Sequence, residues 1–90
     1  MTNAAARDKF QDLNPRQLTV VDMLTGSDDA DAHLAPVTQR GQVIWYAVRG
    51  ANGRVLDSAA WGLKIHVTLT PAEYIMLKYE GFVGEDGRLA

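Results

Sequence analysis

The chain of 90 residues has room for one small domain, because domains typically contain about 100–150 residues and chains this short rarely divide. Its 47% hydrophobic and 22% charged residues are typical of a folded globular protein and exclude a disordered composition. A net charge of -2 excludes a uniform positive field for nucleic acid or an anionic membrane, and the absence of cysteine excludes disulfides, thiolate nucleophiles and cysteine-bound zinc.

The N-terminal residues lack the apolar core of a secretory signal, and no stretch approaches the roughly 18 apolar residues that span a membrane. We therefore expect a cytoplasmic protein that forms one domain over residues 1–90. Residues 4–12 predict a short polar helix that could fray, since alanine favours helix but large apolar side chains are few. On this interpretation residues 1–12 are candidates for mobility, and residues 84–90 form a tail.

A better specified helix is predicted to begin after Asn14. Asn14 is a typical capping residue, Pro15 suits the first helical position, and Gln17 is placed to complete a capping box. The apolar residues that follow the helical period to about residue 25 are Leu18, Val20, Val21, Met23 and Leu24. Residues 27–35 begin with further capping residues and predict one or two helical turns at the surface, ending before Pro36.

The period then changes to that of extended chain. Residues 43–48 are β-branched and aromatic and predict a strand, and Asn52-Gly53 predicts a hairpin turn with a return strand over residues 54–60. Residues 63–69 alternate strictly between apolar and polar, which is typical of a half-buried antiparallel strand.

The last helix is predicted from a second capping box, formed by Thr70 and Glu73 around Pro71, and it ends at Gly81. An extended run at residues 82–83, a turn at 84–87 and a short edge at 88–89 follow. The resulting fold class is α+β: a three-stranded antiparallel meander packed against two to three helices.

The densest polar cluster comprises Asp28, Asp29, Asp31 and His33. These side chains are of the type that binds divalent cations, but an EF-hand register would place Leu34 at the required glycine and Arg40 at the bidentate glutamate. We therefore interpret the cluster as a solvated helix start and assign no metal site, keeping a metal-dependent enzyme only as a third reading.

A second candidate for chemistry is His66, whose predicted strand face also carries Lys64 and Thr68. The only serines, Ser27 and Ser58, lack the glycine-flanked elbow of a nucleophile. Phosphate-binding loops and zinc spacings are also missing. We expect no enzymatic activity and no cofactor.

Nucleic-acid binding is the main alternative function. Helices at 14–25 and 28–35 followed by a hairpin would imitate a helix-turn-helix with a wing, and residues 76–89 resemble the passage from recognition helix to wing in winged-helix regulators. However, the segment at 28–35 that would enter the major groove carries three aspartates, which repel phosphates. The winged-helix resemblance spans only about fifteen residues, and a predicted strand precedes it where that fold needs a helix.

The aromatic residues favour a protein-interaction module. Trp45 and Tyr46 are adjacent in one strand and must point to opposite faces, so a sheet covered on one face leaves one ring outside. Together with Trp61, the outer ring would form an apolar patch for a protein partner or a second copy, with Arg49 and Arg54 at its rim. The competing interpretation is that all these rings pack inside a small core. We predict a non-enzymatic adaptor, regulator or inhibitor.

Overall fold

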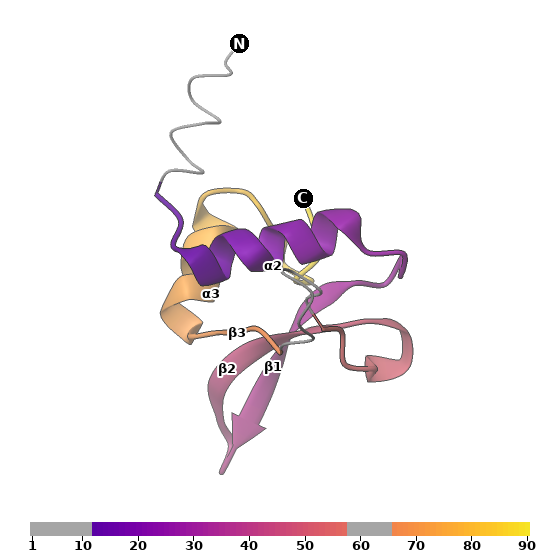
Figure 1. The fold of residues 1–90 in the computed structure, drawn as a ribbon. Helices are drawn as coiled ribbons and strands as arrows, with labels where there is room; N and C mark the ends of the chain where they lie inside the picture. Colours follow the sequence, from indigo (N-terminus) through magenta and orange to yellow (C-terminus); the bar gives the residue numbers. More distant parts are fainter. Residues whose placement is uncertain (1–11, 58–65) are drawn as a thin grey trace.

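The computed structural model describes residues 12–57 and 66–90. These residues form two helices and a three-stranded antiparallel sheet, which confirms the α+β class (Figure 1). The elements are α2 (Pro15–Gly26), β1 (His33–Gln39), β2 (Gln42–Arg49), the 3-10 turn η1 (Ala51–Gly53), β3 (Thr68–Leu69) and α3 (Pro71–Tyr79). Of the helix expected over residues 4–12, residues 4–11 lie outside the described part of the chain. Neither described helix has the length and hydrophobicity of a membrane span.

Both helices begin at the capping boxes that the sequence predicts. The Asn14 side chain accepts a hydrogen bond from the Gln17 amide at 2.9 Å, and the Gln17 side chain accepts one from the Asn14 amide at 2.8 Å. Thr70 and Glu73 form the same reciprocal pair at the start of α3. Each box satisfies backbone N–H groups that a helix start otherwise leaves without partners.

The prediction of helical turns over residues 27–35 is wrong. Asp29 N–H donates to Ser27 Oγ at 3.0 Å and Asp31 N–H donates to Asp29 Oδ1 at 2.9 Å, so the side chains that could cap a helix close turns instead. From His33 the chain is extended, and β1 runs through Pro36. Proline is tolerated there because β1 is an edge strand, paired only with β2.

The strand expected over residues 43–48 is confirmed within β2, but its main hairpin partner is β1. The turn is made by Arg40 and Gly41, which both adopt positive φ. Asn52-Gly53 instead closes η1, after which a single bridge joins Arg49 to Val55, so residues 54–57 form no continuous return strand. Residues 58–60 of that expected strand, and 63–65 of the next, lie outside the described residues. Within the described part the third strand is limited to β3.

The hydrophobic core lies between the helices and one face of the sheet. Leu34, Val48 and Leu69 project from the three strands into a buried cluster shared with side chains of α2 and α3. Tyr46 belongs to the same face and stacks on Tyr74 of α3, with ring centroids 3.8 Å apart and planes 8° from parallel. Figure 1 shows both helices on this side of the sheet. Because side chains alternate along a strand, Trp45 points to the other face.

The N-termini of the two helices meet at Glu73. Its carboxylate accepts hydrogen bonds from the Thr70 amide at 2.8 Å, from Arg16 at 2.7 Å and from the Asn14 side chain. The Gln17 side chain donates to the Glu73 carbonyl at 3.1 Å. Burial raises the pKa of Glu73, but these donors outweigh burial and hold the pKa below its usual value.

The C-terminal residues are more than a tail. Val83 and Leu89 pair in an antiparallel bridge, and the Leu34 amide of β1 donates to the Gly87 carbonyl at 2.9 Å. Gly87 has a φ of 78°, and a β-carbon on it would collide with the Leu34 carbonyl. This turn therefore needs glycine to approach the edge of β1.

We expect Glu73→Gln to lower the free energy of unfolding by about 2 kcal/mol, because a buried, charge-assisted junction of two helix starts is replaced by a neutral amide. The measurement is urea denaturation at pH 7, with Glu85→Gln as control because that side chain is 93% exposed. Since the folded pKa of Glu73 is depressed, the difference between wild type and Glu73→Gln should be present above the unfolded value of 4.5 and shrink as the pH falls through the folded pKa. Equal stability of Glu73→Gln and Glu85→Gln would contradict this role of Glu73.

Candidate functional site

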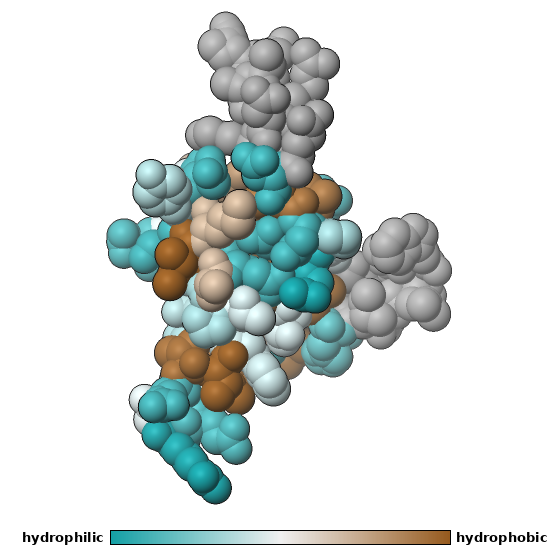
Figure 2. Space-filling model, turned by 90° about the vertical axis from the view of Figure 1, so that its left-hand side faces the viewer, coloured by the Kyte–Doolittle hydropathy of each residue, from teal (hydrophilic) through white to brown (hydrophobic). Residues whose placement is uncertain are grey.

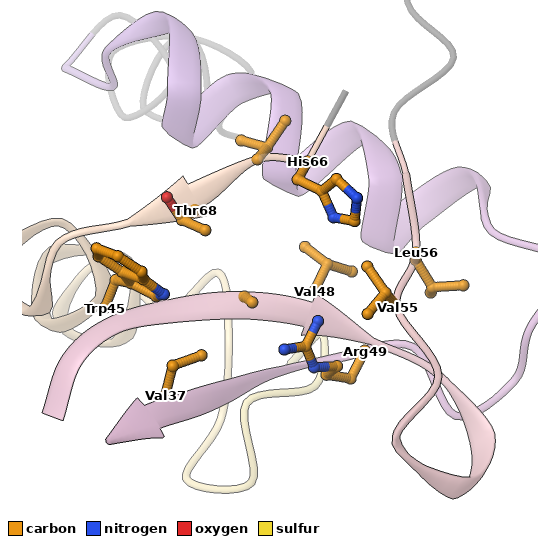
Figure 3. A pocket seen from close by; sticks show the side chains of 10 residues that line it. Val37, Trp45, Val48, Arg49, Val55, Leu56, His66 and Thr68 are labelled. Carbon is orange, nitrogen blue, oxygen red and sulfur yellow. The ribbon is translucent and has the colours of Figure 1, made fainter. Parts of the chain in front are cut away.

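The face of the sheet opposite the helices carries an apolar groove of about 270 Å³. We call this surface the far face. Figure 3 shows the side chains of β1, β2, residues 55–56 and residues 66–68 arranged around the groove. The lining residues are Val37, Trp45, Ala47, Val48, Arg49, Val55, Leu56, His66, Val67 and Thr68. Its middle is hydrophobic, and cationic or polar groups stand at its margin.

The ring that the sequence analysis expects on the outer face is Trp45. Its side chain lines the groove and is 45% exposed, opposite Val37 in the register of β1 and β2. Tyr46 is half-buried against Tyr74, on the helix side. Trp61, the third aromatic of the expected patch, lies outside the described residues. Val55 contributes a second exposed apolar side chain at the groove.

The β1–β2 hairpin carries another exposed apolar side chain near its free end. Val43 is 38% exposed and pairs with Thr38 after the register shift between Val37 and Thr38, so it lies on the other face of the hairpin from Val37 and Trp45. Figure 2 shows hydrophobic residues gathered above the hydrophilic tip of the hairpin, which projects from the body of the molecule. β3 pairs only with Tyr46 and Ala47 of β2, so the outer half of the hairpin is a two-stranded ribbon within the described structure. Such ribbons bury little apolar surface by themselves.

The two rim arginines have different environments. Arg49 lines the groove and makes no ion pair with any residue that the structure describes. Arg54 donates from Nε to the Asp29 carboxylate at 3.0 Å, so part of its guanidinium is already engaged. A third cation, Arg40, stands at the hairpin turn. The sequence alone does not identify it as a site residue, because its place at the turn depends on residues 33–39 forming β1.

Charge is unevenly distributed along the chain. Residues 32–56 contain three of the nine basic residues and none of the eleven acidic residues. Residues 32–56, which include β1, β2 and η1, therefore carry a formal charge of +3, while the rest of the chain carries -5. The small net charge of -2 conceals this separation, which makes the hairpin locally electropositive.

The Asp29 carboxylate joins the loop before β1 to η1. Among the described residues, only Arg54 forms an ion pair with it. Its Oδ2 accepts from the Ala51 amide at 3.0 Å and from Arg54, while Oδ1 accepts from the Asp31 amide. The backbone hydrogen bond from Ala51, then that from Asp31, and the Arg54 contact lower the pKa of Asp29 to about 2. Gly50 lies so close that a β-carbon there would collide with the carboxylate.

The metal site weighed in the sequence analysis does not form from these side chains. Asp29 is engaged by backbone amides and Arg54, Asp31 pairs with Arg88, and the His33 ring contacts the Asp31 carbonyl. Among residues 12–57 and 66–90, no group of three potential ligands is placed to hold a metal ion.

His66, the other candidate for chemistry, is largely exposed and lies 3.2 Å from the Asp57 carboxylate. Thr68 shares the groove with it, as expected for the same face, whereas Lys64 lies outside the described residues.

The features behind the winged-helix alternative are formed in part. Residues 71–79 are helical and residues 83–89 fold back as a short hairpin. The helix expected at 28–35 is absent because these residues form turns and the start of β1, so no helix-turn-helix forms over 14–35. The N-terminal turn of α3 is also committed to the core through Glu73 and Tyr74.

The outer edge of β1 is closed to strand addition over its first half. The Leu34 amide points away from β2 and is taken by Gly87. Pro36, two residues on, occupies the same outward row and has no N–H to offer. Within the described residues, this part of the edge is therefore protected against pairing with a further strand.

Comparisons with known proteins add no relative. No family model, curated protein or solved structure matches the chain.

We expect the stabilising effect of Asp29 to depend on pH. Its folded pKa of about 2 lies below the ordinary aspartate value of 3.8, so the unfolded chain binds more protons between these values and stability rises with pH there. The destabilisation caused by Asp29→Asn should be full above pH 4 and disappear as the pH falls through 2. Urea titrations from pH 2 to 6 measure it, with the exposed neighbour substituted as Asp28→Asn for comparison. A difference that stays constant with pH would refute the role of the charge.

We expect Gly87→Ala to destabilise the protein by about 1–3 kcal/mol, because it combines an unfavourable positive φ with a collision against β1. The matched control is Gly84→Ala, where a β-carbon has only an ordinary contact at 3.4 Å. Denaturation curves give the stability, and amide exchange of Leu34 reports whether the turn has left the strand. Slow exchange in both variants would show that the Gly87 contact is dispensable.

Proposed function

We propose that this chain is a non-enzymatic protein-interaction module that binds a partner protein through the far face of its sheet. The observation that carries the proposal is the position of Trp45, which is 45% exposed in an apolar groove on the face of the sheet opposite α2 and α3. This assignment uses the finer arrangement expected from the sequence, in which the helices pack on one face and leave the other available.

The chemistry of the groove supports a protein ligand. Tryptophan is enriched among residues that dominate binding energy, especially when neighbouring contacts exclude water from it. Val37, Ala47 and Val55 supply such neighbours around Trp45. A partner side chain placed between them would remove apolar surface from water at about 25 cal/mol per Å². Ala47 is small and permits close approach at the centre of the groove.

The alternative functions remain proposals of lower rank. Nucleic-acid binding is favoured only by the local charge of +3, since the aliphatic lining of the groove is unsuited to phosphate. A metal-dependent enzyme has no specific observation in its favour within the described residues.

Substitution of the two adjacent aromatics tests the proposal. Trp45→Ala should leave the free energy of unfolding within about 1 kcal/mol of wild type, because nearly half of the side chain is exposed, whereas Tyr46→Ala should cost about 2–4 kcal/mol through loss of the stack on Tyr74. Binding is measured by affinity purification of the tagged chain from its native cells, followed by native mass spectrometry. Folded Trp45→Ala should lose the partner.

The control is Tyr79→Ala, which removes an aromatic ring that is 87% exposed on α3. It should retain the partner that Trp45→Ala loses. Loss of folding in Trp45→Ala, or equal retention of every partner by both variants, would remove the far face from the proposal.

A further inference from the structure

The distribution of charge around the groove specifies the chemistry of the partner, and this inference rests on the proposed function. We propose that the far face binds an acidic protein segment, which places an apolar side chain against Trp45 and carboxylates near Arg49 and Arg40. Arg49 is one of the residues that line the groove, and Arg40 stands at the turn of the hairpin that carries Trp45.

The spacing of these groups sets the length of the ligand. Trp45 and Arg49 lie on one face of β2, four residues apart, which corresponds to about 13 Å. Arg40 stands at the opposite end of the hairpin, so the two cations are separated by roughly the full length of β2, about 25 Å. An extended segment of about eight residues covers this distance. Carboxylates near its ends and an apolar residue near its middle match the surface.

The ionic state of the arginines supports an acidic ligand. Residues 32–56 contain no carboxylate, the carboxylate of Asp57 that follows lies 3.2 Å from the His66 ring, and Arg49 has no ion-pair partner among the described residues. Arg54 keeps an exposed guanidinium although its Nε is bound to Asp29. Surface cations without internal partners attract an oppositely charged segment and orient it on approach.

A second copy of this chain is the alternative occupant that the test distinguishes. The exposed carboxylates of Asp31, Glu85 and Asp86 pair with Arg88 or Lys78, so these three would have to exchange an existing ion pair to bind the hairpin of another copy.

A nucleic acid fits less well than an acidic peptide. Three arginines neutralise at most three phosphates, and the described lining of the groove offers one indole rather than the series of aromatic rings on which single strands stack. The valine side chains around Trp45 match an aliphatic or aromatic amino-acid side chain.

The test is selection from a library of random twelve-residue peptides displayed on phage, with the full chain as bait and Trp45→Ala as counter-selection. The enriched peptides should carry an apolar residue together with at least two carboxylates. One of them is then synthesised with a fluorescent label, and its binding is followed by anisotropy. Replacing its carboxylates by amides should weaken binding about tenfold or more, and so should the double variant Arg40→Gln/Arg49→Gln of the chain. Lys78→Gln, which removes a cation from α3, should leave the affinity unchanged.

The other outcomes separate this inference from the proposed function. Peptides that need Trp45 but show no acidic preference would overturn the acidic ligand and leave the interaction module standing. Failure to enrich any Trp45-dependent peptide would overturn both. Tighter binding of a labelled twelve-nucleotide single strand than of the peptide would assign the face to nucleic acid. A Trp45-dependent dimer in sedimentation would assign it to a second copy, and either result overturns the acidic ligand.

Discussion

The carboxylate of Glu73 is the contact on which the rest of the structure depends. It receives donors from the start of α3 and from two side chains at the start of α2, so one buried charge holds both helix N-termini together. Positive partial charge at the two helix starts favours an anion at this point. The junction sets both helices on one face of the sheet, where Leu34, Val48 and Leu69 complete the core. Among the described residues, no helix covers the opposite face.

Two other contacts define the limits of that free face. Gly87 reaches the outer edge of β1 and takes the Leu34 amide, so the edge is blocked where a fourth strand could begin. Asp29 joins the loop before β1 to η1, which follows β2. A small domain with few helices thereby protects its hydrogen-bonding edge while leaving side chains exposed on the face. This division favours recognition by side-chain contacts over strand addition.

The sequence predicted the features that depend on local chemistry. Both capping boxes involve residues three positions apart, and both form as expected from Asn14 and Thr70. The strand at 43–48 and the opposite directions of Trp45 and Tyr46 also follow from the backbone period alone. The partner of β2 did not follow, because Pro36 was interpreted as the end of a helix although an edge strand accepts it. Turn-forming residues stand on both sides of β2, at Arg40-Gly41 before it and at Asn52-Gly53 after it. Because β2 pairs along its length with β1, Arg40-Gly41 forms the hairpin turn.

The part of the site that could not be predicted depends on contacts between distant segments. In the sequence, Asp29 is one member of an acidic cluster. In the structure, it accepts hydrogen bonds from Ala51 and Arg54, more than twenty residues away in the chain, and so fixes the loop before β1. Backbone contacts also order the segment that follows η1. The Leu56 amide donates to the Val48 carbonyl and the Gly50 amide to the Arg54 carbonyl, so the chain itself holds the wall of the groove that carries Val55. Because ordering a loop on binding costs free energy, a wall fixed in advance would leave more of the contact energy of Trp45 to appear as affinity in the interaction that we propose.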